Sequence, residues 1–136
     1  MRHIPKPILI FSIYRADESK ETNEVAHYAA MSVLEGAKAE FIELEGSYLN
    51  QREKSFLVQD WELRGLIETL CRAYKQESYI ESHGDRFTTL CYLNGHRENI
   101  GYLVNVSEQE AKASGSWSYN PNSGYFITKK NREGVA

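Results

Sequence analysis

The chain has 136 residues, an apolar fraction of 41% and a formal net charge of −3. This length predicts one domain over residues 1–136, and the apolar fraction is too high for a disordered chain. A basic face is missing apart from Lys129, Lys130 and Arg132, and no apolar run reaches the roughly 20 residues of a membrane span. We therefore expect a soluble, intracellular protein with neither nucleic acid nor membrane as a partner.

The first elements alternate between strand and helix. Residues 8–14 are a nearly continuous apolar run, which is typical of a strand covered on both faces. The polar stretch "RADESKETN" follows and offers several helix N-caps. A helix is predicted from there to about Glu35, with Gly36 at the position of a C-terminal cap. One side of that helix carries Val25, Tyr28, Ala29, Ser32 and Val33.

A hairpin and the clearest helix come next. Strands are predicted at about 39–44 and at 55–58, joined by a connection rich in polar residues. Asp60 is a candidate N-cap for the next helix. Its apolar residues recur with the i, i+3, i+4, i+7 spacing of an amphipathic helix: Leu63, Leu66, Ile67, Leu70, Cys71 and Tyr74.

The second half of the chain reads mostly as strands. A fourth strand begins near Ser78, turns at "HGDR" and pairs with residues 87–92, and Asn94-Gly95 favours a tight turn before a strand at 100–106. A short polar helix is predicted at 108–113. The stretch "SGSWSYNPNSGYFIT" is interpreted as a loop that ends in a last strand at 125–128.

This order predicts an α+β fold, a ferredoxin-like βαββαβ sandwich with an added C-terminal β-hairpin and loop. Both helices would cover one face of a mostly antiparallel sheet. The opposite face would need cover from the C-terminal extension or from another subunit, which favours a homo-oligomer.

The cysteines and histidines argue against a metal site. Cys71 and Cys91 lie in apolar surroundings without a CxxC pair, as expected of buried thiols in a reducing compartment. The four histidines are scattered, and none has metal-ligand spacing with a cysteine or another histidine. We expect neither a metal nor a cofactor.

Polar residues at the ends of elements are the candidates for a site. Tyr48 and Glu53 occupy the two arms of the hairpin, where a phenol and a carboxylate facing one space would bind an ammonium or sulfonium group. The alternative is a surface turn in which Glu53 pairs loosely with Lys54 or Arg52.

Three further segments carry the remaining candidates. Gln76, Glu77 and Ser78 lie between the second helix and the fourth strand, although helix-end polarity explains them equally well. Arg15 directly follows the first strand and would reach a ligand carboxylate unless it pairs with a neighbouring acid. Trp117, with Tyr119 and Tyr125, would stack on a purine or cover a sheet face.

Seven short stretches follow one another in a recognisable order: "SIYR", Asn23-Glu24, "GSY", "EKS", "KQES", "GSW" and "GYFIT". Together they resemble the bacteriophage S-adenosylmethionine lyases, first described as hydrolases, over most of the chain. The resemblance implies a homotrimer with substrate bound between subunits, in the cytoplasm of an infected bacterium. It also implies cleavage of S-adenosylmethionine to methylthioadenosine and homoserine lactone.

Carried over by position, the resemblance implies that Glu53 and Tyr48 are the catalytic residues. The substrate-binding residues would be Ser12, Arg15, Gln76, Glu77, Ser78 and Trp117. In this chemistry the α-carboxylate of the substrate attacks its own γ-carbon, so that no protein nucleophile is needed. The alternatives are a non-enzymatic nucleotide sensor on the same trimeric scaffold and an inhibitor that acts through its aromatic tail.

Overall fold

The computed structural model describes residues 7–83 and 87–130. Within these ranges the chain forms eight strands, three α-helices and one short 3-10 helix at Trp61–Leu63. The helices are α1 (Lys20–Gly36), α2 (Arg64–Ala73) and α3 (Glu108–Ser114). The strands are β1 (Ile8–Phe11), β2 (Phe41–Tyr48), β3 (Gln51–Val58), β4 (Ser78–Ser82), β5 (Thr88–Tyr92), β6 (Arg97–Asn105), β7 (Trp117–Asn120) and β8 (Gly124–Lys129).

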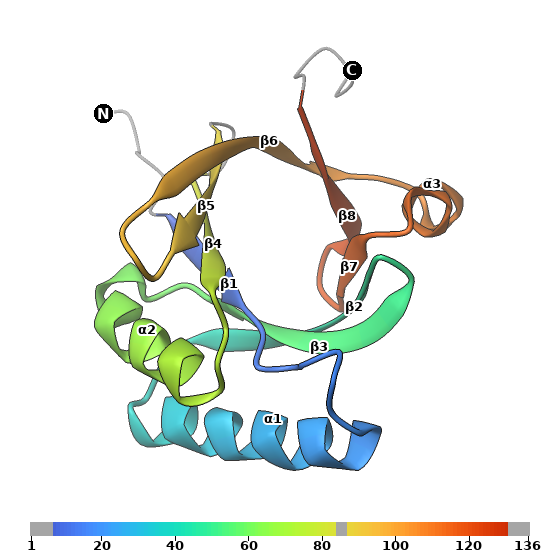
Figure 1. Ribbon diagram of the computed structural model, residues 1–136. Helices are drawn as coiled ribbons and strands as arrows, with labels where there is room; N and C mark the ends of the chain where they lie inside the picture. The colour runs from blue at the N-terminus through green and yellow to red at the C-terminus, as the bar shows by residue number, and fades with distance from the viewer. Residues whose placement is uncertain (1–6, 84–86, 131–136) are drawn as a thin grey trace.

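The strands close into an antiparallel barrel in the order β1-β3-β2-β7-β8-β6-β5-β4, with β4 returning to β1. Figure 1 shows the ring that they form. The predicted ferredoxin-like sandwich is therefore wrong, although the first six elements do alternate as expected. The segment predicted as a loop contains β7, which pairs with β2 on one side and with β8 on the other. Because β8 pairs in turn with β6, the sheet continues around to β4 and leaves no open face.

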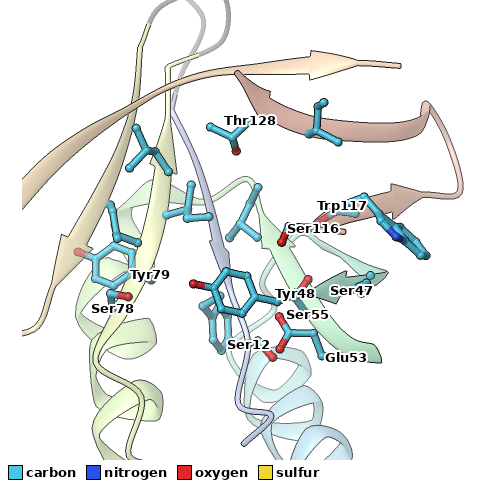
Figure 2. Close-up of a pocket in the computed structure, with 18 of the residues that line it drawn as sticks. Ser12, Ser47, Tyr48, Glu53, Ser55, Ser78, Tyr79, Ser116, Trp117 and Thr128 are labelled. Carbon is cyan, nitrogen blue, oxygen red and sulfur yellow. The ribbon is translucent and has the colours of Figure 1, made fainter. Parts of the chain in front are cut away.

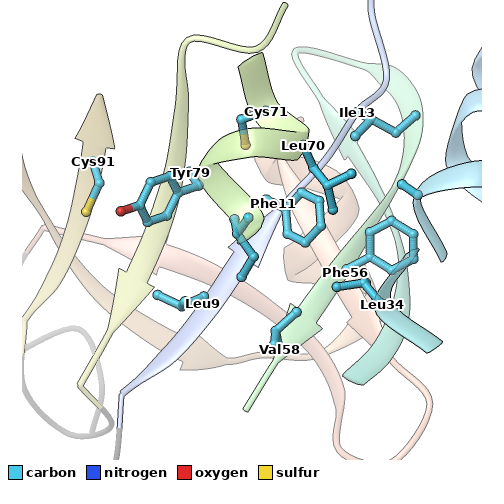
Figure 3. Packing of buried hydrophobic residues seen from close by; sticks show 12 residues of the cluster. Leu9, Phe11, Ile13, Leu34, Phe56, Val58, Leu70, Cys71, Tyr79 and Cys91 are labelled. Carbon is cyan, nitrogen blue, oxygen red and sulfur yellow. The ribbon is translucent and has the colours of Figure 1, made fainter. Parts of the chain in front are cut away.

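The main hydrophobic core lies outside the barrel, between its wall and two helices. Figure 1 shows α1 and α2 beside the β1 and β3 side of the ring, and Figure 3 shows the side chains packed there. Leu9 and Phe11 of β1 and Phe56 and Val58 of β3 point into this core and are almost fully buried. The intervening Ile10 belongs to a second, inner cluster. Strand β1 is thus covered on both faces, as its continuous apolar run predicts.

Helix α1 begins where the sequence predicts. Ser19 is its N-cap, and the Ser19 hydroxyl accepts a hydrogen bond from the Thr22 N–H at 3.1 Å. The helix turns a different side inward from the one that carries Val25, which is 72% exposed. Its buried residues are Asn23, His27, Ala30 and Leu34.

The inward side of α1 is held by aromatic and polar contacts with the barrel. The His27 ring stacks on Phe56 with centroids 4.3 Å apart, and its Nε2 lies 2.8 Å from the Glu43 carboxylate. These contacts explain why a histidine occupies a core position.

In α2 the predicted apolar side is confirmed by the burial of Ile67, Leu70 and Cys71. The Asp60 side chain does not cap the helix that follows it. Its carboxylate accepts a hydrogen bond from the Glu40 N–H instead.

The β2–β3 hairpin turns through only two residues, Leu49 and Asn50, with φ angles of 51° and 65°. Such left-handed conformations are typical of the turn type that matches the twist of a tight hairpin. The Asn50 N–H donates to the Gly115 carbonyl and the Leu49 N–H to the Ser116 hydroxyl, at 3.0 and 3.1 Å. The residues that precede the predicted third strand therefore belong to β3 and not to a loop.

Candidate functional site

A cavity of about 710 Å³ lies inside the barrel. Its volume falls within the range of roughly 300–1,000 Å³ that small-molecule sites occupy. All eight strands contribute residues to its lining, and Figure 2 shows eighteen of them.

The β2–β3 hairpin supplies the charged side of the cavity. Its register pairs Tyr48 with Gln51 and Gly46 with Glu53. Since side chains alternate between the two faces of a strand, Tyr48, Gln51, Glu53 and Ser55 all fall on the inner face. All four line the cavity, and Figure 2 shows Glu53, Tyr48 and Ser55 close together. Arg52 and Lys54 fall on the outer face, so neither forms the loose surface pair with Glu53 that an ordinary solvated turn would have.

Glu53 is the only carboxylate among the described residues that line the cavity. It is half-buried, and no hydrogen bond or ion pair links its side chain to another described residue. Burial raises the pKa of Glu53 from 4.5 to about 6. Partial burial of an unpaired anion lowers the stability of the folded protein, and a bound cationic ligand would offset this loss of free energy.

Gln76, Ser78 and Ser12 also line the cavity. The Gln76 amide nitrogen donates to the Tyr14 carbonyl at 2.8 Å, which fixes the side chain. Its amide oxygen accepts no hydrogen bond from another described residue. The Ser12 hydroxyl donates to the Lys54 carbonyl at 2.6 Å and accepts from the Tyr14 N–H at 3.1 Å. Ser12 therefore holds the end of β1 against β3 and has little capacity left for a ligand.

Three other candidate residues lie differently. Glu77 is exposed and does not line the cavity. Arg15 is likewise outside the lining, and its guanidinium forms a two-point pair with Asp17 at 2.9 and 2.7 Å. Trp117 contributes to the lining, but Figure 2 shows its indole directed away from Glu53. The indole packs against Tyr125 and lies 5.1 Å from the Arg52 guanidinium carbon.

Several lining residues were not among the predicted site residues. Ser55 follows Glu53 by two positions, so the period-2 alternation along β3 was a signal that would have identified it. Ser47, Ser116, Ser118 and Thr128 also contribute to the lining. Most of these lie on β7 and β8 or next to them, and β7 was predicted as a loop, in which side chains do not alternate between two faces.

The described part of the cavity holds no evident protein nucleophile activated by a base. Cys71 and Cys91 are buried outside the lining, and burial raises the pKa of Cys71 to about 12 and raises that of Cys91. No histidine is found among the described lining residues, so none of the serines there has the usual proton acceptor. Within residues 7–83 and 87–130 no group of histidine, cysteine and acidic side chains is placed to hold a metal ion.

The fold is a closed barrel whose cavity has the size of a small-molecule site, and its described lining offers one carboxylate, aromatic rings and several hydroxyl groups. The sequence model of the S-adenosylmethionine lyase family matches residues 9–129, which include almost the whole barrel. The chain belongs to this family, and it is an S-adenosylmethionine lyase whose substrate is S-adenosylmethionine. No curated protein matches the chain. None of the described helices has the length and apolar character needed to cross a membrane.

Proposed function

We propose that the enzyme cleaves S-adenosylmethionine by intramolecular attack, giving methylthioadenosine and L-homoserine lactone. An oxygen of the substrate α-carboxylate forms a bond to the γ-carbon, and the bond from that carbon to sulfur breaks. The bonding electrons pass to sulfur, which leaves as a neutral thioether. The step closes a five-membered lactone, and it requires no proton transfer and no oxidant.

The unpaired Glu53 carboxylate is the observation that carries this proposal. Its raised pKa of about 6 still leaves it mostly ionised at neutral pH, and S-adenosylmethionine brings an ammonium and a sulfonium. We assign the ammonium to Glu53, because that contact orients the amino-acid chain without using its carboxylate, which must stay free to attack. A serine or cysteine nucleophile is not needed, in keeping with the lining described above.

Tyr48 and Gln76 complete the amino-acid end of the proposed site. The Tyr48 ring lies beside Glu53 on the same face of the hairpin and would contact the sulfonium through its π-face. The amide oxygen of Gln76 would accept a hydrogen bond from the ammonium, and Ser78 would contact a polar group nearby. Ser12 acts as a positioning residue, and Arg15, Glu77 and the Trp117 indole have no assigned contact within one subunit.

Holding the substrate curled accounts for much of the expected rate enhancement. Correct orientation of two groups in one molecule lowers a barrier by roughly 7–11 kcal/mol. Exclusion of water adds to this, because the carboxylate and sulfonium charges are neutralised as the reaction proceeds and bulk water favours the charged ground state.

The test is product analysis with purified enzyme and S-adenosylmethionine. Homoserine lactone should appear before homoserine, together with methylthioadenosine. Free homoserine formed directly would instead indicate attack by water, with Glu53 as general base. Glu53→Gln should lower kcat/KM by about 30- to 5,000-fold, the range for loss of one partner of a buried charge pair at about 2–5 kcal/mol. Glu45→Gln makes the same charge change at an exposed position of β2 and serves as the matched control.

We propose that the enzyme works as a homotrimer in which a neighbouring subunit covers the cavity. Tyr48 and Leu49, at the hairpin tip, are 61% and 71% exposed, and burying their apolar surface under a neighbouring subunit would stabilise the assembly. Leu49→Asp tests this, because aspartate is tolerated better than leucine at a positive φ and should not disturb the isolated hairpin. Light scattering should show trimers for the unaltered chain and smaller species for the variant. Monomers of the unaltered enzyme with full activity would refute the proposal.

We further infer a role in a bacterial cell infected by a phage, where destruction of S-adenosylmethionine would deprive host restriction and methylation systems of their methyl donor. The chain's family membership supports the reaction, and the host role extends from it. Expression in a methylating bacterium should lower S-adenosylmethionine and leave newly made DNA undermethylated, whereas Glu53→Gln should do neither.

A further inference from the structure

One side of the cavity is built almost entirely from carbon. Five side chains form this surface, which we call the apolar wall: Ile80, Leu90, Ile100, Leu103 and Phe126. They come from β4, β5, β6 and β8, which make up the part of the ring farthest from the Glu53 hairpin. Ile80, Leu103 and Phe126 pack in part against the inner cluster of Ile10, Leu44 and Leu57. All five remain only half-buried and line the cavity. Covering that surface with a flat, weakly polar group is favourable at about 25 cal/mol per Å².

The wall has few groups that would recognise a ligand by hydrogen bonds. Thr128 and Lys130 are the polar side chains that β8 and the residue after it add to the described lining. Strand β4 adds Ser78, placed above at the amino-acid end, and Tyr79, whose hydroxyl donates to the Glu68 carboxylate at 2.7 Å. In Figure 2, Thr128 lies across the cavity from Glu53 and Ser12. By contrast, the Glu53 side of the cavity has a carboxylate, a phenol, two amides and several serine hydroxyls.

Most backbone N–H and C=O groups of the wall are engaged in pairing between strands and are not available to a ligand. In a closed barrel every strand has a neighbour on both sides, so the peptide groups point along the wall and not into the lumen. Ile80 pairs with Ile10 and Leu90, Leu103 with Thr128, and Phe126 with Ser118 and Asn105. There are two exceptions among the described pairings. Ile100 lies at the bulge where Thr88 pairs with Gly101 and Thr89 with Asn99, and Leu103 lies beyond the β5 pairing and has a partner on the β8 side alone.

The two ends of the substrate would therefore lie in different environments, one beside Glu53 and the other beside the apolar wall. If the ammonium binds Glu53, as in the proposed function on which this inference rests, the adenosine end extends toward the apolar wall. There the edge of the purine that carries the exocyclic amino group meets hydrocarbon. We propose that the enzyme does not recognise this amino group, and that its substrate class is S-nucleosyl methionine sulfonium compounds selected by their amino-acid end.

The factor by which an enzyme prefers one substrate over a close analogue distinguishes an apolar pocket from a site that forms hydrogen bonds. A pocket that contacts a ligand only through carbon distinguishes close analogues by about 10- to 200-fold, whereas a site built to hydrogen-bond a polar group rejects analogues without it by about 10⁴–10⁵-fold. The hypoxanthine analogue of S-adenosylmethionine replaces the amino group with a carbonyl oxygen, turns the neighbouring N1 from an acceptor into an N–H donor, and leaves the sulfonium and amino-acid groups unchanged. It therefore isolates recognition of the base.

The experiment measures kcat/KM for both compounds with the purified full-length enzyme, following release of the corresponding methylthionucleoside. We expect the two values to differ by less than about 100-fold. A larger ratio in favour of the adenine compound overturns the inference while leaving the proposed function intact. If S-adenosylmethionine itself is left uncleaved, the proposed function fails as well.

Thr128→Val provides a second, independent readout. The substitution removes the one hydroxyl that β8 directs to the cavity while keeping the side chain close to its original size. We expect the ratio between the adenine and hypoxanthine compounds to change by less than about threefold, whatever happens to the absolute rates. A ratio that collapses toward one in the variant would show that Thr128 recognises the amino group, and it would overturn the inference.

Discussion

Replacing Glu53 with glutamine should make the protein more stable and much less active. The ionised carboxylate is half-buried without a partner among the described residues, and its pKa rises from 4.5 to about 6 as a result. A difference of 6 − 4.5 = 1.5 in pKa corresponds to about 2 kcal/mol at 1.36 kcal/mol per unit. Glutamine has the same shape but no charge to desolvate, although its amide remains partly buried. We therefore expect Glu53→Gln to raise the free energy of unfolding by about 1–2 kcal/mol at pH 8.

The sign of this effect depends on pH. Because the folded-state pKa of Glu53 is higher than the unfolded value, its destabilising contribution is fully present above the folded pKa of about 6 and absent below 4.5. The gain from Glu53→Gln should therefore be largest at pH 7–8 and should vanish near pH 4. In thermal unfolding it corresponds to an increase in Tm of about 3–8 °C at pH 8.

The assay compares urea unfolding of the unaltered chain, Glu53→Gln and the exposed control Glu45→Gln at pH 8 and pH 4.5, with methylthioadenosine release measured on the same preparations. The control should change stability by less than about 0.5 kcal/mol at either pH. A Glu53→Gln protein that is less stable than the unaltered chain at pH 8 would show that the carboxylate has a stabilising partner. In that case the cationic-ligand site would have no physical basis.

Three further predictions concern the same cavity. The kcat/KM for S-adenosylmethionine should fall about tenfold per pH unit below a pH of about 6 and stay level above it, because the free enzyme needs ionised Glu53; a profile that is flat between pH 5 and 8 would contradict this assignment. Tyr48→Phe should keep the ring and most activity, whereas Tyr48→Ala should lower kcat/KM by about 2- to 30-fold, as expected for loss of a cation–π contact of 0.5–2 kcal/mol; equal losses in both variants would point to the hydroxyl instead. Gly46→Ala should destabilise the protein by about 1–3 kcal/mol, because a Cβ there would lie 2.5 Å from the Trp117 carbonyl oxygen; unchanged urea unfolding would show that β2 and β7 separate easily.

Short-range chemistry determined much of the local structure. The Ser19 cap, the apolar side of α2 and the polar helix α3 follow from hydrogen bonding and side-chain spacing within a few residues. The pair formed by Tyr48 and Glu53 also belongs to this level, because both lie on one hairpin and alternate onto the same face. That residues 1–136 form a single lyase-like domain stays a prediction.

Long-range pairing decided the rest. Closure of the barrel depends on β7 meeting β2, with Gly46 against Ser118, across about seventy residues of chain. A segment as short as "WSYN" has no periodicity that predicts such a partner, so the sandwich expected from the first six elements remained the simplest arrangement. Closure then turned the inner faces of the strands into a cavity, gathered serines from both halves of the chain and left Arg15 paired with Asp17 outside it.

The amino-acid sequence by itself therefore determined the helices, the hairpin and the acidic residue at its centre, since these depend on neighbours in the chain. Only the tertiary structure decided that this acid is unpaired and partly desolvated, and that it faces a wall of hydrocarbon. Desolvation is a property of everything that surrounds a group in space, and most of what surrounds Glu53 lies far from it along the chain.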